Sequence, residues 1–151
     1  MNDAENFSES GPVLPLPLVI GVTGHRDLRD EDQKPLKAHV RQIFTELRNR
    51  YPSTPLILLS GLAEGADRLV AEVALEKGAR LIAPLPLPKA LYEEDFLTQA
   101  SRDEFNHLLQ QAEYWLELPL LKVAPEEEVC QTDMARDEQY AQLGAYLVLH
   151  S

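Results

Sequence analysis

Three short apolar runs, separated by segments of helical periodicity, constrain the fold of this chain more than any other feature. The runs cover residues 18–23, 56–60 and 80–84, and each is apolar at successive positions rather than at alternate ones. Strands of this kind are buried on both faces, which is typical of parallel sheets. Because strands and helices alternate with short connections, the pattern predicts βαβ units with right-handed crossovers. The expected fold class is therefore α/β, a three-layer sandwich around a mainly parallel sheet of at least four strands.

The first helical segment is expected to begin near Lys34, with Pro35 in its first turn, and to end at Tyr51-Pro52. Its apolar residues recur at helical spacing and predict the inward face: Leu36, Val40, Ile43, Phe44 and Leu47.

The same kind of apolar pattern predicts further helices and a fourth strand. A second helix is expected from about 64 to 77, with Gly78 as its cap. Helical patterning resumes over 91–112 with a break near 98–101, and a last helix is expected over 134–149. A fourth, weaker strand is expected at 114–118, with Trp115 in the core.

Charge and composition narrow the class of partner. The chain has 151 residues, a net charge of −11 and a pI of about 4.7. Such a surface repels phosphate backbones, so nucleic acid is disfavoured as a partner, whereas a small anionic ligand held by local amides and arginines is not. The single cysteine, Cys130, excludes an internal disulfide and a cysteine-based zinc site. The acidic run at 126–128 is read as a solvated face, and no metal site is expected.

The chain is expected to be cytoplasmic. Its first ten residues lack the apolar region of a signal peptide, and no apolar run approaches the ~20 residues that span a bilayer. We expect residues 1–13 to form a flexible tail and 14–151 a single domain.

The first of two glycine-containing turns follows the first strand, as Gly21-Val22-Thr23-Gly24-His25-Arg26. Gly24 lets a ligand approach the backbone, and Thr23 offers a hydroxyl and an amide. His25 can donate or accept near neutral pH, and Arg26 carries a forked donor set suited to phosphate or carboxylate. The alternative is a tight turn in which His25 and Arg26 pair with nearby aspartates.

The second turn follows the second strand, as Ser60-Gly61-Leu62-Ala63-Glu64-Gly65-Ala66-Asp67. Free amides at the start of the following helix can bind anions. Glu64 and Asp67 either complement the helix dipole or have a functional role, as hydrogen-bond partners of ribose hydroxyls or in acid–base chemistry. Arg68 is expected to pair with Glu64 on the helix surface rather than to reach the site. Ligands of parallel sheets bind beyond the carboxyl ends of the strands, where both turns lie.

Weaker candidates lie in the loop after the third strand. Pro86 and Pro88, with the residues that follow, are expected to form a wall over the pocket. Tyr92 could stack on a base or pack in the core. The residues of this wall beyond the prolines are Tyr92, Asp95 and Phe96.

The segments Val19–Arg26 and Leu59–Arg68 together resemble the SLOG superfamily, a Rossmann-like group. It includes the DNA-processing protein DprA (Smf), the LOG or "lysine decarboxylase-like" phosphoribohydrolases, and the YpsA group. The second turn is similar to the second glycine loop of DprA, and the first turn is closer to the YpsA-like and ligand-sensor branches. The resemblance covers residues 18 to about 151. It implies a pocket for a nucleotide-derived ligand, lined by Gly24, His25, Arg26, Ser60, Gly61, Glu64, Gly65 and Asp67.

The resemblance also has limits. The Pro-Gly-Gly-x-Gly-Thr-x-x-Glu motif of the phosphoribohydrolases is absent from this sequence. In related chains, the last helix is followed by another strand and a glycine-rich loop, whereas this chain ends at His150-Ser151. This leaves open whether the domain is truncated at its C-terminus, as part of a longer protein. A homodimer is also left open.

The leading hypothesis is a module that binds or senses a small anionic nucleotide-like molecule, with a signalling role, no required cofactor and no catalysis. The alternative is a nucleotide hydrolase of the LOG type, in which Glu64 would be the general base or would stabilise an oxocarbenium ion, and Arg26 would hold the phosphate. The third hypothesis is DprA-like binding of single-stranded DNA, which the charge of −11 opposes. The expected ligand-binding residues are Thr23, Gly24, His25, Arg26, Ser60, Gly61, Glu64, Gly65 and Asp67.

Overall fold

Four parallel strands form one sheet in this computed structural model, which describes residues 15–121 and 133–151. The strands lie in sequence order and are β1 (Leu18–Val22), β2 (Leu56–Ser60), β3 (Arg80–Leu85) and β4 (Tyr114–Glu117). All three pairings are parallel. The predicted α/β fold with a parallel sheet of at least four strands is therefore confirmed. The expected tail, 1–13, lies outside the described residues, as do the acidic run at 126–128 and Cys130.

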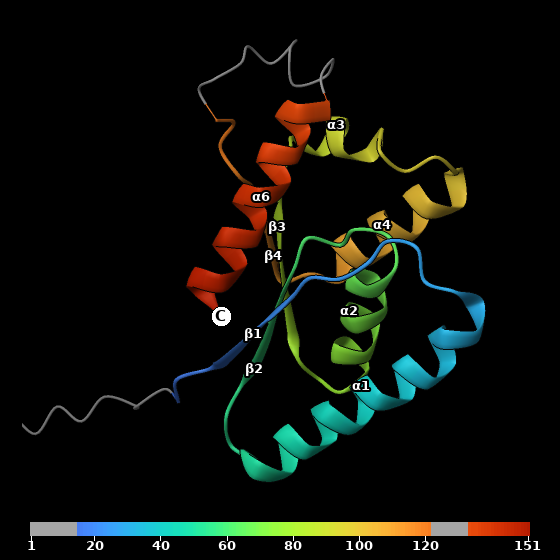
Figure 1. Cartoon of the computed structure of the whole chain (residues 1–151). Coiled ribbons are helices and arrows are strands. Elements are labelled where there is room, and N and C mark those ends of the chain that lie inside the picture. Colours follow the sequence, from blue (N-terminus) through green and yellow to red (C-terminus); the bar gives the residue numbers. More distant parts are fainter. Residues whose placement is uncertain (1–14, 122–132) are drawn as a thin grey trace, which may run out of the picture.

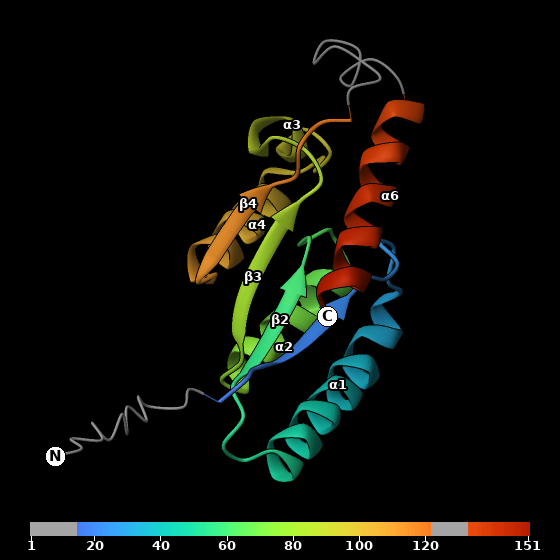
Figure 2. The ribbon, with the colours of Figure 1, turned by 90° about the vertical axis from the view of Figure 1, so that its left-hand side faces the viewer.

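The helices form a layer on each face of the sheet. Because each crossover moves one strand further in the same direction, right-handed connections place the helices that follow β1, β2 and β3 on one face. Figures 1 and 2 show this layer of α1 (Asp30–Arg50), α2 (Ala66–Glu76) and α4 (Gln99–Gln111), with α6 (Asp133–His150) on the opposite face. The short α3 (Lys89–Glu93) lies beyond the carboxyl end of β3.

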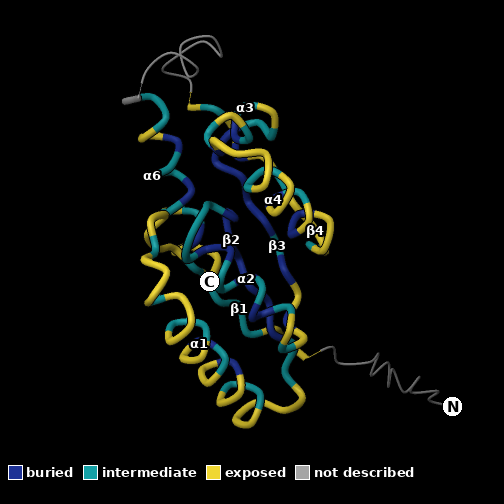
Figure 3. Tube along the Cα trace, turned by 90° about the vertical axis from the view of Figure 1, so that its right-hand side faces the viewer, coloured by how far each residue is buried: buried dark blue, intermediate teal, exposed yellow. Residues whose placement is uncertain are grey.

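The core divides in the same way, because alternate residues of each strand point to opposite faces. Leu58 and Leu81 pack under α1, α2 and α4, whereas Ile57 and Leu59 pack against Leu143 of α6. In Figure 3, β2 and much of β3 are buried, whereas the outer side of α1 is exposed. No helix among the described residues is long and apolar enough to cross a membrane.

The first helix begins earlier than the sequence indicated. It starts at Asp30 rather than near Lys34, because three acidic residues in its first turn complement the positive end of the helix dipole. Pro35 consequently lies inside the helix and not in its first turn. The expected inward face is also narrower, since Ile43 is 43% exposed.

Other boundaries lie close to those expected. The expected helical break lies slightly earlier than 98–101, between the end of α3 at Glu93 and the start of α4 at Gln99, where the Ser101 N–H donates to Thr98 Oγ1 at 3.1 Å as a cap. Gly78 ends α2 in the left-handed region, at a φ of 74°. Trp115 was expected in the core and is 40% exposed, because β4 is an edge strand.

Candidate functional site

The two glycine turns pack directly against each other, because β1 and β2 are adjacent and end at the same edge of the sheet. The Ala66 N–H donates to the His25 carbonyl oxygen at 3.0 Å. A Cβ on Gly24 would lie 2.5 Å from the Cβ of Ala66, and one on Gly65 would lie 2.2 Å from the Arg26 carbonyl oxygen. Glycine at both positions is therefore required for this contact between backbones.

A buried carboxyl group sits beneath this contact. The Asp67 residue is 6% exposed. Burial raises the pKa of Asp67 to about 6, although backbone N–H groups of Ala63 and Gly24, and the charges of Arg26 and Arg68, act in the opposite direction. Because its N–H partners come from both turns, Asp67 ties the two turns together.

Leu62 has a strained backbone in the second turn. Its φ is 56°, in the left-handed region that disfavours side chains, and the residue is fully buried. Its N–H donates to Ser60 Oγ at 3.1 Å, and its carbonyl oxygen accepts from Arg68 Nε at 3.0 Å. These bonds on both sides of the residue hold the strained conformation in place.

Arg68 lies inward beneath α4, with only 3% of the residue exposed. Its Nη1 donates to Glu104 Oε2 at 2.8 Å and to the Ser101 carbonyl oxygen at 2.9 Å. Its Nη2 is buried and has no hydrogen-bond partner among the described residues. The expected surface pair with Glu64 is wrong, since α4 supplies the partner and Glu64 instead accepts a hydrogen bond from the Ser101 hydroxyl.

Arg26 is held by a phenol rather than by a carboxylate. Its Nη2 donates to the Tyr140 hydroxyl at 2.7 Å, and its guanidinium carbon lies 5.1 Å from the centre of the Tyr140 ring. The Tyr140 hydroxyl donates in turn to Asp95, which is paired with Arg136. Since Tyr140 and Arg136 belong to α6, this chain of contacts joins the first turn to the last helix.

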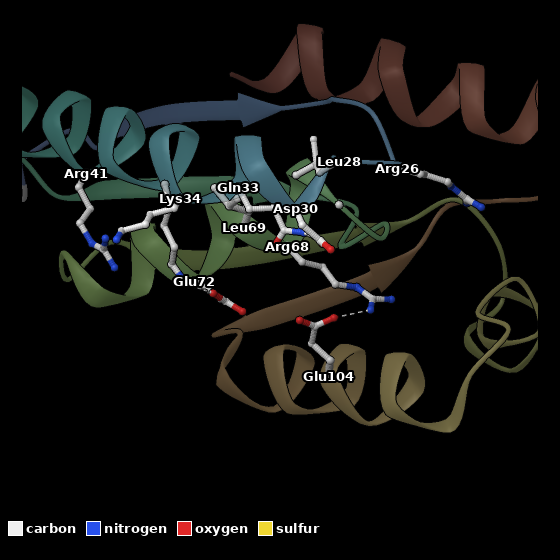
Figure 4. A pocket seen from close by; sticks show the side chains of 12 residues that line it. Arg26, Leu28, Asp30, Gln33, Lys34, Arg41, Arg68, Leu69, Glu72 and Glu104 are labelled. Atoms are coloured by element: carbon white, nitrogen blue, oxygen red, sulfur yellow. Dashed lines mark hydrogen bonds and ion pairs between the residues drawn. The ribbon is translucent and has the colours of Figure 1, made fainter.

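A cleft of about 560 Å³ borders both turns and runs between α1, α2 and α4. Figure 4 shows its labelled side chains, with Arg68 extending from α2 toward Glu104 and Arg26 pointing away from the others at one end. Five of the lining residues are cationic and three are acidic. The lining is formed by Arg26, Leu28, Asp30, Gln33, Lys34, Lys37, Arg41, Gly65, Arg68, Leu69, Glu72 and Glu104.

The structure distributes the predicted site residues over three depths. Thr23, Gly24, His25 and Arg26 are exposed, Glu64 and Gly65 are half-buried, and Ser60, Gly61 and Asp67 are buried. Of these, Arg26 and Gly65 line the cleft. The buried three support the turns from below, so in this conformation they would shape a site without touching a ligand.

Two of the residues that were expected to form a wall over the pocket lie in the core instead. Tyr92 and Phe96 are fully buried, and their rings pack edge to face with centres 5.0 Å apart. The Tyr92 hydroxyl donates to the Gly61 carbonyl oxygen at 3.0 Å. Of the two alternatives for Tyr92, core packing is confirmed, and it braces the second turn.

Lys34 and Glu104 are lining residues that sequence reasoning missed. The signal for the first was the spacing of Lys34, Lys37 and Arg41, which places three cations on one face of a helix. Glu104 comes from a helix remote in sequence, and no local pattern pointed to it. The described residues contain no group of three or more side chains that could hold a metal ion.

Comparison with known proteins adds little to this geometry. No protein-family model and no curated protein matches the chain. Among solved structures, it is similar to the DNA processing protein A (DprA) of Streptococcus pneumoniae, with 17% identity and a TM-score of 0.35. The match covers 85% of this chain and 48% of that one, so this chain spans about half the length of that relative. A likeness at this level assigns neither family nor function, and the SLOG resemblance stays a prediction.

Proposed function

We propose that this protein binds a small anionic, nucleotide-like ligand in the cleft that borders the two glycine turns. The observation that carries the proposal is the charge of the lining: five cationic and three acidic side chains, on a chain whose net charge is −11. Three of these cations are paired with glutamates, so Arg26 and Lys34 are the ones best placed to attract an anion locally. Its volume of about 560 Å³ is within the range of roughly 300–1,000 Å³ that small-molecule sites occupy.

Arg26 is the side chain best suited to make the first contact with the ligand. It is exposed, borders the cleft and donates to a neutral hydroxyl, so no carboxylate neutralises its charge directly. A phosphate could accept from its remaining N–H groups without displacing an ion pair. Gly65 lines the same cleft and lets the start of α2 pack directly against the backbone of Arg26.

The contacts of Glu64 favour binding of the ligand over its hydrolysis. In the alternative, hydrolysis of an N-glycosidic bond, Glu64 would act as the base. Its Oε1 already accepts a hydrogen bond from Ser101, and it does not line the cleft. We therefore infer a sensing or binding role, consistent with the hypothesis of signalling.

Thermal unfolding in the presence of a nucleotide panel tests the proposal. The panel holds nucleoside mono-, di- and triphosphates and dinucleotides, and at least one should raise the Tm of the wild type saturably. Arg26→Gln should remove most of that shift. Arg50→Gln, which deletes the same charge from the last turn of α1, should keep it. The proposal is wrong if no nucleotide stabilises the wild type, or if both variants lose the shift equally.

A further inference from the structure

A ladder of ion pairs joins α1 to α2 along one side of the cleft. Lys37 Nζ lies 2.5 Å from Glu72 Oε2, and Arg41 Nε lies 3.0 Å from Glu76 Oε1. From the first pair to the second, both helices advance by four residues, which is one helical turn. The two helices therefore run in the same direction with matched faces, α1 giving the cation and α2 the acid.

The ion pairs between α1 and α2 do not continue one helical turn closer to the glycine turns. There α2 carries Arg68, and α1 carries Gln33 followed by Lys34, so neither helix supplies an acid. All three residues line the cleft, as Figure 4 shows. Gln33 Nε2 donates to Asp30 Oδ1 at 3.3 Å, while Lys34 forms no ion pair with any described residue. Lys34 and Arg68 thus line the cleft together with two carboxylates near the glycine turns, Asp30 of α1 and Glu104 of α4.

Glu104 forms an ion pair with Arg68 but belongs to neither α1 nor α2. It belongs to α4, its side chain is 49% exposed, and its partner Arg68 is 3% exposed. An exposed carboxylate is replaced more easily than a buried one, because water already solvates it. The buried Arg68 stays fixed by Leu62 and Ser101 when that carboxylate leaves.

We propose that Lys34 and Arg68 form a phosphate subsite, in which Glu104 stands where the phosphate of a ligand would bind. The subsite would give the ligand of the proposed function a phosphate or pyrophosphate group that reaches between α1 and α2. A guanidinium offers forked donors to phosphate oxygens, and an ammonium adds a mobile point charge. Nη2 of Arg68 is buried and has no hydrogen-bond partner among the described residues, so this guanidinium keeps a donor that the rest of the described structure does not use.

Titration of the full chain with inorganic pyrophosphate, followed by calorimetry, tests the subsite independently of any nucleobase. Lys34→Gln should weaken binding roughly threefold to tenfold, the effect of losing one partly solvated charge. Glu104→Gln keeps an oxygen acceptor for Arg68 but removes the competing charge, so it should tighten binding by a similar factor. Arg50→Gln is the control for net charge and should leave the affinity unchanged.

The opposite effects of the two variants keep the test apart from effects on folding. Loss of structure could weaken binding in Glu104→Gln but could not tighten it, and Lys34 is exposed. The subsite is overturned if Lys34→Gln binds pyrophosphate as the wild type does, or if Glu104→Gln fails to tighten it. If both variants change pyrophosphate binding as predicted but no nucleotide stabilises the protein, the proposed function is overturned and the subsite stands.

Discussion

Gly65 combines a left-handed backbone with a close approach, at a φ of 84° and with the Arg26 carbonyl oxygen on the side where a Cβ would point. We predict that Gly65→Ala lowers the free energy of unfolding by about 2–4 kcal/mol. A side chain in the left-handed region costs about 1–2 kcal/mol, and the first turn must also move away. Urea unfolding measures the difference.

Gly144 provides the matched control for that substitution. It lies in α6, and a Cβ there would meet nothing within 4 Å. Gly144→Ala should raise stability by about 0.5–1 kcal/mol, because alanine is the better helix former. If Gly65→Ala is as stable as the wild type, the two turns do not pack as described.

Asp67 should make stability depend on pH. Because burial raises its pKa to about 6 in the folded protein, from 3.8 when unfolded, the folded state binds the proton more tightly. This stabilising contribution is complete below pH 4 and is lost as the pH rises through 6. We predict that Asp67→Asn, which stays neutral, matches the wild type near pH 4 and exceeds its stability by about 2 kcal/mol near pH 7.5.

The comparison needs unfolding curves of both proteins across that pH range. Other carboxylates shift the absolute stability, and taking the difference between the two proteins removes their effect. A difference that does not change with pH would show that Asp67 does not bind a proton near pH 6.

Among the elements, α6 is fixed to the carboxyl end of the sheet by a few polar side chains. Gln139 is 1% exposed, and its Nε2 donates to the Pro86 carbonyl oxygen at 2.8 Å while its Oε1 accepts from the Leu121 N–H at 2.8 Å. One turn of the same helix adds Arg136 and Tyr140, which both contact Asp95. The last helix therefore contacts both the loop after α3 and the first glycine turn.

We predict that Tyr140→Phe loosens α6 and the first turn together. The hydroxyl accepts from Arg26 and donates to Asp95, and burial raises its pKa above the ordinary value, so it stays protonated as a donor. Removing it should cost about 1–2 kcal/mol of stability. Hydrogen exchange should quicken in α6 and in residues 23–29 while β3 keeps its protection. Unchanged exchange in both segments would contradict the link.

At the scale of the whole molecule, the repeated alternation of apolar runs and helical segments was sufficient to predict the layers. Runs such as Leu56–Ser60 are apolar at every position before the terminal serine, and only a strand covered on both faces explains that. The pattern could not reveal the strand order, because right-handed crossovers permit several orders of a parallel sheet. The start of α1 was misplaced because Pro35 is a signal for a first turn but is tolerated a few residues later.

The cleft was harder to predict than the turns. Both turns were found because glycine after an apolar run marks a local feature of the chain. The pairs that line the cleft join residues about 35 positions apart, such as Lys37 with Glu72 and Arg68 with Glu104. Their register depends on how α1, α2 and α4 pack, and local rules therefore assigned Arg68 to the wrong carboxylate.

The order of the strands along the chain determines which residues of the cleft are synthesised first. Since β1 and β2 are neighbours, eleven of the twelve residues around the cleft lie between positions 26 and 72. A ribosome would have released nearly every wall of the cleft before α4 was synthesised. Glu104 alone arrives later, so a change confined to α4 could retune the preference for anions without rebuilding the rest.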